Sequence, residues 1–261
     1  MNDLSEADNI AQVAQHLQQA QRVLFITGAG LSADSGLPTY RGIGGLYQQQ
    51  DTEDQVPIEV ALSYGMLRTH PALTWKYLLQ IEQACRGVGY NRGHEVIAKL
   101  AQDKEVWVLT QNIDGFHHAA GSPNLIEIHG RLQHIHCMSC KHKEVWPDFS
   151  HLQLENLPPV CPACGGILRP AVVLFGEMLS PLETLSLTQQ VQQGFDIVFS
   201  VGTSSLFPYI VAPVLEAKHD GVPTVEINPG KTEISNAVDY RLRNRAAKIL
   251  DDIWNTWKQM S

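Results

Sequence analysis

The sequence of 261 residues lacks the features of a membrane or secreted protein. No apolar run approaches the roughly 18 residues of a membrane span, and the acidic, polar start MNDLSEADNI is unlike a signal or transit peptide. Positive charge is also scarce, since 19 Lys and Arg stand against 27 Asp and Glu, for a net charge of −8. We therefore expect a cytoplasmic protein with no membrane association and no direct binding of nucleic acid.

Cysteine is scarce as well, with five residues in the chain. In an acidic protein of the cytoplasm, metal ligation or free thiols explain them better than disulfides do. The remaining composition, 44% apolar and 18% charged, is enough for a sizeable core, and the length suits one large domain or two small ones. Neither the cysteines nor the charge pattern demands a second subunit, so we expect a monomer.

Short apolar runs alternate with helical patterns along the chain. The runs are rich in β-branched residues and predict buried strands at 22–27, 106–110, 197–201 and 222–227. Helical patterns lie before, between and after them, at 5–21, 94–100, 182–193 and 249–257, and Ser5 and Asp8 are expected to form a capping pair at the start of the first. This alternation predicts the α/β class, with a parallel sheet that is covered by helices on both faces.

Two segments interrupt the alternation. Residues from Gly42 to about Gly65 form a loop-like stretch that leads into a helical pattern at 75–85. Residues 131–170 are rich in Cys, His and Pro and have no strong periodicity. We expect both segments to be insertions into the α/β framework.

The first predicted strand runs into the sequence TGAGLSADSG. Gly28, Gly30 and Ala33 fit the G-x-G-x-x-A form of the dinucleotide-binding turn, whose backbone N–H groups meet a pyrophosphate. A dehydrogenase also needs an acidic residue about 20 positions later, at the tip of a second strand. Here Glu53 and Asp54 lie in a polar loop with no strand before them. Two interpretations stay open: a dinucleotide held in another manner, or a glycine turn without a ligand.

Four of the cysteines form two pairs, Cys137-x-x-Cys140 and Cys161-x-x-Cys164, with twenty residues between the pairs. Two such knuckles place four thiolates around one Zn²⁺, and a closed set of four cysteines indicates a structural zinc. Unmetallated thiols and a redox pair are the weaker alternatives. The fifth, Cys85, lies in a helical pattern and is expected to be a buried apolar residue.

A polar cluster follows the predicted strand at 106–110, in the stretch LTQNIDGFHHAAG. Taken alone, its Gln, Asn, Asp and His residues and the later His129 could form an ordinary wet turn. However, ligands of open α/β sheets bind beyond the carboxyl ends of the strands. Another strand end, SVGTSS, offers hydroxyl groups that suit ribose or phosphate. A binding site at this edge of the sheet is therefore the better interpretation.

These motifs together resemble those of sirtuins, the NAD-dependent protein-lysine deacylases, in their bacterial type. The resemblance covers residues 20 to 250 and rests on motifs in the family's order: GAGLSADSGLPTYRG (28–42), TQNIDGFHHAAG (110–121), IHG (128–130), the two cysteine pairs, VVLFGE (172–177), GTSS (202–205) and IN (227–228). It implies a Rossmann-like NAD-binding domain (1–42, 86–130 and 171–261), a cofactor loop with a helical insertion (43–85) and a zinc-ribbon module (131–170).

The resemblance also implies the chemistry. In this family the acyl oxygen attacks the ribose carbon that carries nicotinamide, and a histidine then acts as general base on a ribose hydroxyl. The products are nicotinamide, deacylated lysine and O-acyl-ADP-ribose. His129 matches that histidine, and a base whose pKa is near neutrality suits a weakly acidic hydroxyl. NAD is then a co-substrate, one zinc per chain is structural, and the partners are acetylated proteins or peptides.

Further roles follow from the same resemblance, position by position. Asn112 and Asp114 are expected to line the nicotinamide and ribose pocket, Asn112 with a catalytic role, and Gln111 to contact a ribose. The remaining cofactor residues are the phosphate turn Gly28, Ala29 and Gly30, the covering loop with Tyr40 and Arg41, and the ribose and phosphate contacts Gly202, Thr203, Ser204 and Asn228. The peptide is expected to pair with a strand edge at Val172, Phe175 and Gly176, although Phe175 could also belong to the core.

Several positions depart from the family pattern or take no part in it. Tyr40 replaces the usual Phe, and the sequence RLRNRAAKIL (241–250) leaves the adenine contacts unassigned. Leu78 and Ile81 stand where relatives that remove succinyl or malonyl groups carry Tyr and Arg, which favours acetyl or longer apolar acyl groups. Acetyl is our first choice. His117 and His118 are interpreted as turn residues whose replacement changes little, and Asp34 as a helix-start residue.

Three functions remain to be compared. The first is an NAD-dependent protein-lysine deacetylase. The second is a deacylase for longer apolar acyl groups or a protein ADP-ribosyltransferase, because the same pocket would activate the same bond. The third is a sensor of NAD or ADP-ribose without turnover, which His129 argues against, since a sensor needs no base there.

Overall fold

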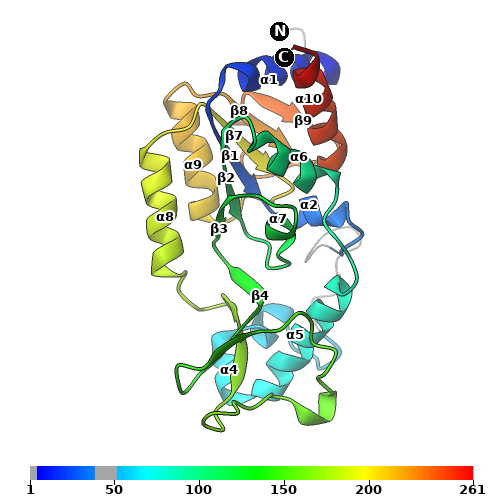
Figure 1. Ribbon diagram of the computed structural model, residues 1–261, viewed down its shortest axis with the longest axis vertical. Coiled ribbons are helices and arrows are strands. Elements are labelled where there is room, and N and C mark those ends of the chain that lie inside the picture. Colours follow the sequence, from blue (N-terminus) through cyan, green and yellow to red (C-terminus); the bar gives the residue numbers. More distant parts are fainter. Residues whose placement is uncertain (1–4, 39–51, 261) are drawn as a thin grey trace.

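A parallel six-stranded sheet forms the centre of the larger of two lobes (Figure 1), in the computed structural model, which describes residues 5–38 and 52–260. The strand order is β3–β2–β1–β7–β8–β9, and every neighbouring pair is parallel. The strands are β1 (Arg22–Thr27), β2 (Glu105–Thr110), β3 (Asn124–Glu127), β7 (Ile197–Val201), β8 (Thr224–Ile227) and β9 (Tyr240–Leu242). The four predicted strands are confirmed, the last beginning two residues late, and β3 and β9 were not predicted.

Helices cover both faces of this sheet, as the α/β prediction requires. On one face α1 (Glu6–Gln19), α6 (Arg92–Leu100) and α10 (Ala246–Met260) share an apolar layer with β1 and β2. On the other, α8 (Pro181–Gln192) and α9 (Pro208–His219) cover a second apolar layer. The predicted capping pair starts α1: the Ser5 hydroxyl accepts from the Asp8 amide, and the Asp8 carboxylate accepts from the Ser5 amide. Burial on both faces explains why β1 and β7 read as continuous apolar runs.

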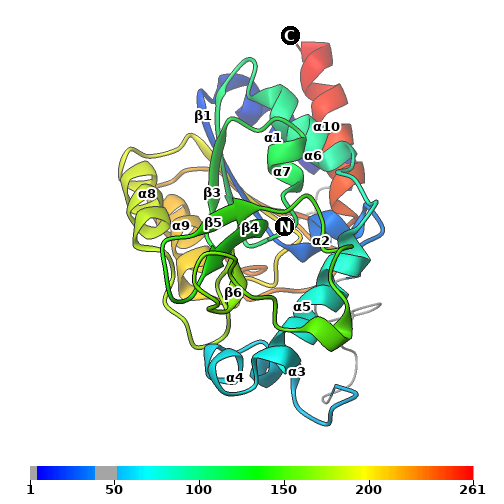
Figure 2. The same ribbon diagram turned by 60° about the horizontal axis from the view of Figure 1, so that its bottom comes forward.

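The smaller lobe combines the two insertions, which lie below the sheet in Figure 1 and come forward in Figure 2. It contains an antiparallel sheet, β5–β4–β6, and several helices. The elements are α3 (Ile58–Ala61), α4 (Tyr64–Thr69), α5 (Pro71–Cys85), β4 (Gly130–Cys137), β5 (Lys143–Val145), the 3₁₀ helix η1 (Leu154–Asn156) and β6 (Leu168–Val172). The segment 131–170 therefore has more regular structure than its sequence predicted.

One core holds the two insertions together. Trp75 of α5 is completely buried, contacts Trp146 and Phe149 with its ring, and donates from Nε1 to the Leu168 carbonyl at 2.8 Å. Leu78 and Ile81 are 2% and 4% exposed in the same core. These are the positions where relatives that remove succinyl or malonyl groups are expected to carry Tyr and Arg. Leu78 and Ile81 act as packing residues of the smaller lobe.

Two short helices lie where the lobes meet. α2 (Ala29–Ala33) follows β1 directly, and α7 (Phe116–Ala119) follows the polar stretch after β2. Both lie at the end of the sheet that faces the smaller lobe (Figure 1), so the carboxyl ends of the parallel strands open toward that lobe. Within the described residues, none of the helices has the length and hydropathy to cross a membrane.

Candidate active site

The glycine turn after β1 packs directly against the turn after β7. A side chain on Gly30 would come within 2.7 Å of the Gly202 Cα, and one on Gly28 within 2.8 Å of the Thr203 Cβ. The Gly28 amide donates to the Val201 carbonyl and the Gly30 amide to the Gly202 carbonyl, at 3.0 and 2.8 Å. Two of the three amides expected to hold phosphate are thus used inside the protein. Ala29, as the first residue of α2, is the one whose N–H has no acceptor within the helix.

Asn112 and Asp114 converge on Ser32 of α2. The Asn112 side-chain amide donates to the Gly28 carbonyl and to the Ser32 hydroxyl, both at 3.0 Å, so its Oδ1 is the atom it can offer to a ligand. Asp114 accepts from the Ser32 hydroxyl at 2.7 Å and from the Phe116 amide at 2.9 Å. Burial raises the pKa of Asp114 against the effect of these hydrogen bonds. Ser32 belongs to this group, although the sequence analysis gave it no role.

Gln111 connects the polar stretch to the β7 turn. Its side-chain amide donates to the Thr203 hydroxyl at 2.7 Å, and Asn228, after β8, donates to the Thr203 carbonyl at 3.0 Å. Thr203 is 5% exposed and holds the turn together, whereas the neighbouring Ser204 is exposed. Of these two hydroxyls, that of Ser204 is the one accessible to a ligand.

His129 lies on the chain that crosses from the larger lobe to the smaller one, between β3 and β4. Its Nδ1 lies 3.1 Å from the Gln111 carbonyl oxygen, and its Nε2 lies 2.7 Å from the Tyr209 hydroxyl. Burial lowers the pKa of His129, and the Gln111 carbonyl opposes that shift. The side chain is thus held at both nitrogens and is neutral near pH 7. Tyr209 was missed because SSLFPYIV reads as plain apolar sequence.

The predicted peptide edge lies beside His129. The Val173 amide donates to the His129 carbonyl at 2.9 Å, and Val172 pairs with Gly130 in the sheet. Phe175 is 40% exposed, but its amide donates to the Leu62 carbonyl and its carbonyl accepts from the Tyr64 amide. Its backbone is therefore occupied in this conformation. Gly176 is exposed, while Val172 is buried and packs in the core.

The four predicted metal ligands converge in the smaller lobe. Within the described residues, the group of potential ligands at this place consists of Cys137, Cys140, Cys161 and Cys164, whose sulfur atoms all lie within 4.8 Å of one another. The Cys137–Cys164 and Cys140–Cys161 sulfur distances are 3.5 and 3.7 Å. Tetrahedral zinc with bonds of about 2.3 Å needs about 3.8 Å between sulfurs, whereas a disulfide needs about 2.05 Å. The cluster therefore fits a structural Zn²⁺.

Four other residues discussed in the sequence analysis are Tyr40, Arg41, Cys85 and Asp34. Tyr40 and Arg41 lie outside the described residues. Cys85 is partly buried, and burial raises the pKa of its thiol to about 12. Asp34 does not start its own helix. It ends α2, and its carboxylate accepts from the Ala247 amide at 2.7 Å and pairs with Arg245 at the start of α10.

The interpretation of His117 as a turn residue is wrong. It is 2% exposed, its Nε2 lies 2.9 Å from the Thr27 hydroxyl, and its ring contacts that of His94 with 4.8 Å between centroids. Burial lowers the pKa of both histidines, that of His94 to about 4. A helix as short as α7 is too brief for periodicity to reveal its buried face. His118 is exposed, as expected.

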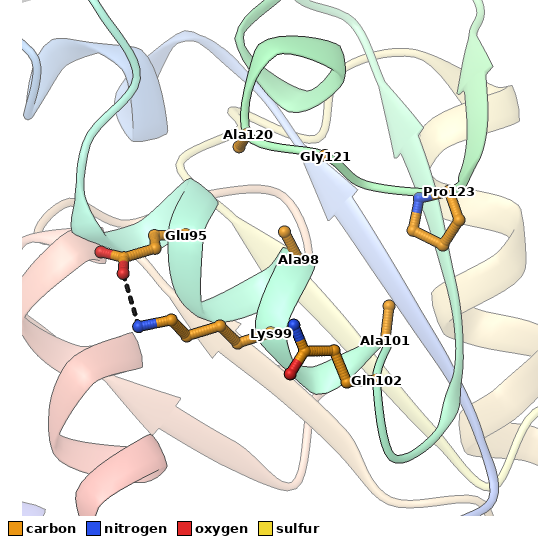
Figure 3. A pocket seen from close by; sticks show the side chains of 8 residues that line it. All are labelled: Glu95, Ala98, Lys99, Ala101, Gln102, Ala120, Gly121 and Pro123. Carbon is orange, nitrogen blue, oxygen red and sulfur yellow. Dashed lines mark ion pairs between the residues drawn. The ribbon is translucent and has the colours of Figure 1, made fainter.

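A surface hollow lies outside the candidate site, between α6 and the turn from α7 to β3 (Figure 3). Its lining residues are Glu95, Ala98, Lys99, Ala101, Gln102, Ala120, Gly121 and Pro123. Glu95 and Lys99 form an i,i+4 ion pair along the helix. None of the lining residues belongs to the candidate site at the strand ends.

Fold and site together define an α/β protein with a dinucleotide-type turn, a half-buried histidine at the strand ends and a four-cysteine cluster that fits a metal ion. The chain belongs to the Sir2 family, whose model matches residues 28–208. The NAD-dependent protein deacylase 2 of Pseudomonas aeruginosa is 53% identical over 247 residues, which cover 94% of this chain and 95% of that protein. The NAD-dependent protein deacylase of Pyrococcus abyssi is 36% identical over 247 residues, covering 92% and 95%.

Solved structures agree with this assignment. A Sir2 homolog–NAD complex has a TM-score of 0.85 at 29% identity and covers 95% of this chain and 94% of that one. A Sir2 homologue in complex with 2′-O-acetyl ADP ribose has a TM-score of 0.84 at 29% identity and covers 95% and 96%. The resemblance to sirtuins and the prediction of a Rossmann-like sheet with a zinc ribbon are therefore confirmed.

Proposed function

We propose that this protein is an NAD-dependent protein-lysine deacetylase. It transfers the acetyl group of acetyl-lysine to the ADP-ribose part of NAD and releases nicotinamide, deacetylated lysine and O-acetyl-ADP-ribose. The observation that carries the proposal is the position of His129. A neutral imidazole, fixed at both nitrogens, lies beside the turn formed by Gln111 and the glycine loop, where parallel strands end. The names of the deacylase relatives support the same activity.

NAD, once bound, supplies a ribose–nicotinamide bond whose cleavage exposes the ribose carbon to the acyl oxygen. In our proposal the Ala29 amide and the Ser204 hydroxyl face the phosphates. Asn112 presents Oδ1 to the reacting ribose, since its amide is committed to Gly28 and Ser32. Asp114 holds Ser32 and so keeps this wall of the pocket in place. Gln111 and Asn228 brace the β7 turn through Thr203.

His129 then acts as general base. Its Nε2 accepts the proton of a ribose hydroxyl, while the Nδ1–H remains on the Gln111 carbonyl and stabilises the imidazolium that forms. Because burial lowers the pKa of His129, the imidazole is unprotonated and ready to accept at neutral pH. Zinc has no part in these steps. Cys137, Cys140, Cys161 and Cys164 would hold it with no coordination position left for substrate, and it would stabilise the lobe that borders the peptide edge.

The proposed substrates are acetylated proteins or peptides, and the peptide is proposed to lie along the segment that joins Val172 to Gly176. The net charge of −8 has the same sign as nucleic acid and therefore supports the view that nucleic acid is not a partner. We further propose that the protein acts as a monomer in the cytoplasm. Size-exclusion chromatography with light scattering tests the monomer, which a mass near 58 kDa, twice 29.0 kDa, would contradict.

Incubation of the purified protein with NAD and an acetyl-lysine peptide tests the function. We expect nicotinamide, deacetylated peptide and O-acetyl-ADP-ribose, each detected by mass spectrometry. A peptide that carries ADP-ribose would indicate an ADP-ribosyltransferase instead. Turnover of a myristoyl-lysine peptide alone would indicate a long-chain deacylase, and NAD binding without nicotinamide release would indicate a sensor.

A further inference from the structure

Tyr209 is the side chain that faces the proposed base. It is the second residue of α9, and its hydroxyl lies 2.7 Å from the His129 Nε2. Its ring is stacked on that of Phe207, with 5.4 Å between centroids and 11° between planes. Both rings meet the imidazole edge to face, at 6.0 and 5.9 Å. The phenol is therefore fixed by its own neighbour as well as by the histidine.

The second partner of the ring decides which way this hydrogen bond runs. Nδ1 lies 3.1 Å from the backbone carbonyl oxygen of Gln111, and a carbonyl oxygen can only accept. In the neutral ring Nδ1 must therefore carry the proton, and Nε2 carries the lone pair. The Tyr209 hydroxyl must then donate to Nε2. Burial raises the pKa of Tyr209 to about 12, which keeps the phenol protonated and able to donate.

We propose that Tyr209 is a positioning residue for His129: its hydroxyl caps the lone pair of Nε2, holds the ring in the Nδ1–H tautomer and yields its place to the ribose hydroxyl that is to be deprotonated. The inference rests on the proposed function, because it gives Tyr209 a task only if His129 is the base.

The proton balance of the step follows from this geometry. The O–H bond of the ribose hydroxyl breaks and an N–H bond forms at Nε2, so the ring becomes an imidazolium with a proton on each nitrogen. Nδ1–H stays on the Gln111 carbonyl throughout. An imidazolium can no longer accept the Tyr209 hydrogen bond. The cap therefore favours the neutral, reactive form of the histidine and opposes its protonation by solvent.

The charged groups on the elements around the ring have partners of their own. Asp114 is held by Ser32 and the Phe116 amide, Glu127 by Arg131, and Glu177 by Arg169. Burial works to raise the pKa of Glu177, but its bonds to Arg169 and the Leu174 amide outweigh that and lower it. The groups in hydrogen-bond contact with the imidazole nitrogens are thus the Gln111 carbonyl and the Tyr209 hydroxyl.

The variant Tyr209→Phe removes one oxygen and keeps the ring that stacks on Phe207. We expect the pKa of His129, followed by NMR of the labelled imidazole, to rise by about half to one unit, the contribution of one ordinary hydrogen bond to the neutral form. The acid limb of kcat/KM should move to higher pH by the same amount. In the unmodified protein the ring nitrogens should show the Nδ1–H tautomer.

The chain offers a matched control. Tyr240 and His16 form a second tyrosine–histidine pair, between β9 and α1, with 2.9 Å between the hydroxyl and Nε2. Tyr240→Phe removes the same atom far from the site and should leave both the His129 titration and the pH profile unchanged.

The outcomes separate this inference from the proposed function. An Nε2–H tautomer in the unmodified protein, or an unchanged His129 pKa in Tyr209→Phe, overturns the role of Tyr209 even if deacetylation is confirmed. A shifted pKa in a protein that does not deacetylate supports the cap on His129 and refutes the proposed function, and with it the yielding of Tyr209 to a ribose hydroxyl.

Discussion

The two lobes bury their apolar side chains in different ways. The larger lobe has two apolar layers, one on each face of a six-stranded sheet, and buries strands such as β7 completely. The smaller lobe has one core, assembled from two segments that are distant in the sequence and centred on Trp75 and Phe149. It also contains a cluster of four cysteines, of which Cys137 and Cys161 belong to this core. The first lobe is held by burial, whereas we expect the second to need a bound zinc as well.

This difference explains where the site lies. The sheet is fixed by its two layers, so the strand ends can carry Gly28, Asn112 and Thr203 in polar turns without loss of the fold. His129 lies on the strand connection that crosses between the lobes, where Gln111 and Tyr209 of the larger lobe hold its two ring nitrogens.

The largest effect is expected from loss of a zinc ligand. Cys137→Ala should abolish the one zinc per chain and unfold the smaller lobe, because structural zinc contributes about 10 kcal/mol or more to the folding of such modules. Metal analysis and limited proteolysis should show loss of zinc and cleavage within 131–170, with the larger lobe intact. Cys85→Ala, outside the cluster, should keep its zinc. Full zinc content in Cys137→Ala would contradict the account of the smaller lobe.

The next largest effect is expected from replacing His129, which lies on the connection between the lobes. His129→Ala should lower kcat/KM for deacetylation by about 10²–10⁴-fold, the usual contribution of a general base. Zinc content and the melting temperature should change little, since both lobes keep their cores. Steady-state kinetics at saturating NAD check this, and activity within a factor of two of the unmodified protein would refute the role of His129.

Replacing the buried His117 and its exposed neighbour His118 tests how the larger lobe is packed. His117→Ala should lower the free energy of unfolding by about 2–4 kcal/mol, because it leaves a cavity and removes the partner of Thr27. His118→Ala, one residue further and exposed, should change it by less than about 0.5 kcal/mol. Urea titration compares the two, and equal stabilities would mean that His117 is not buried.

A pH dependence of the free energy of unfolding is also expected from the larger lobe. The pKa values of His94 and His117 are lowered by burial, that of His94 to about 4. Below the ordinary pKa of about 6.5 the unfolded chain binds protons that the folded chain refuses, so stability falls with falling pH. Between about pH 6.5 and pH 4 His94 should contribute a slope of up to about 1.4 kcal/mol per pH unit, and His117 adds to the slope in the same direction. His94→Phe should remove one such slope in urea titrations, and an unchanged slope would contradict it.

The sequence predicted those parts whose signal is local. The strands at 22–27 and 197–201, the capping pair of α1 and the cysteine spacing each carry their pattern within a few residues. β3 and β9 were missed because they are short and lack an apolar run. β4, with the sequence GRLQHIHC, was missed because its alternation is irregular: two residues separate the buried Leu132 from the buried Ile135, where the pairing with β6 shifts register.

The site was predicted only in part for the same physical reason. Motif order located His129 and Asn112, but pairings such as His129 with Tyr209, 80 positions apart, depend on how α9 packs against the sheet of the larger lobe. The motif also indicated free amides at Gly28 and Gly30, whereas these amides donate to the carbonyls of Val201, the last residue of β7, and of Gly202 in the turn after it. His117 looked like a loop residue because its burial comes from β1 and α6, far away in the sequence.

The most direct test of the central claim is the stoichiometry of the reaction. With NAD and an acetyl-lysine peptide, one nicotinamide should be released for each lysine deacetylated, and the acetyl group should be recovered on ADP-ribose. Deacetylation without NAD, or nicotinamide release with the acetyl group still on the peptide, would contradict the claim that the strand ends and His129 together perform the transfer.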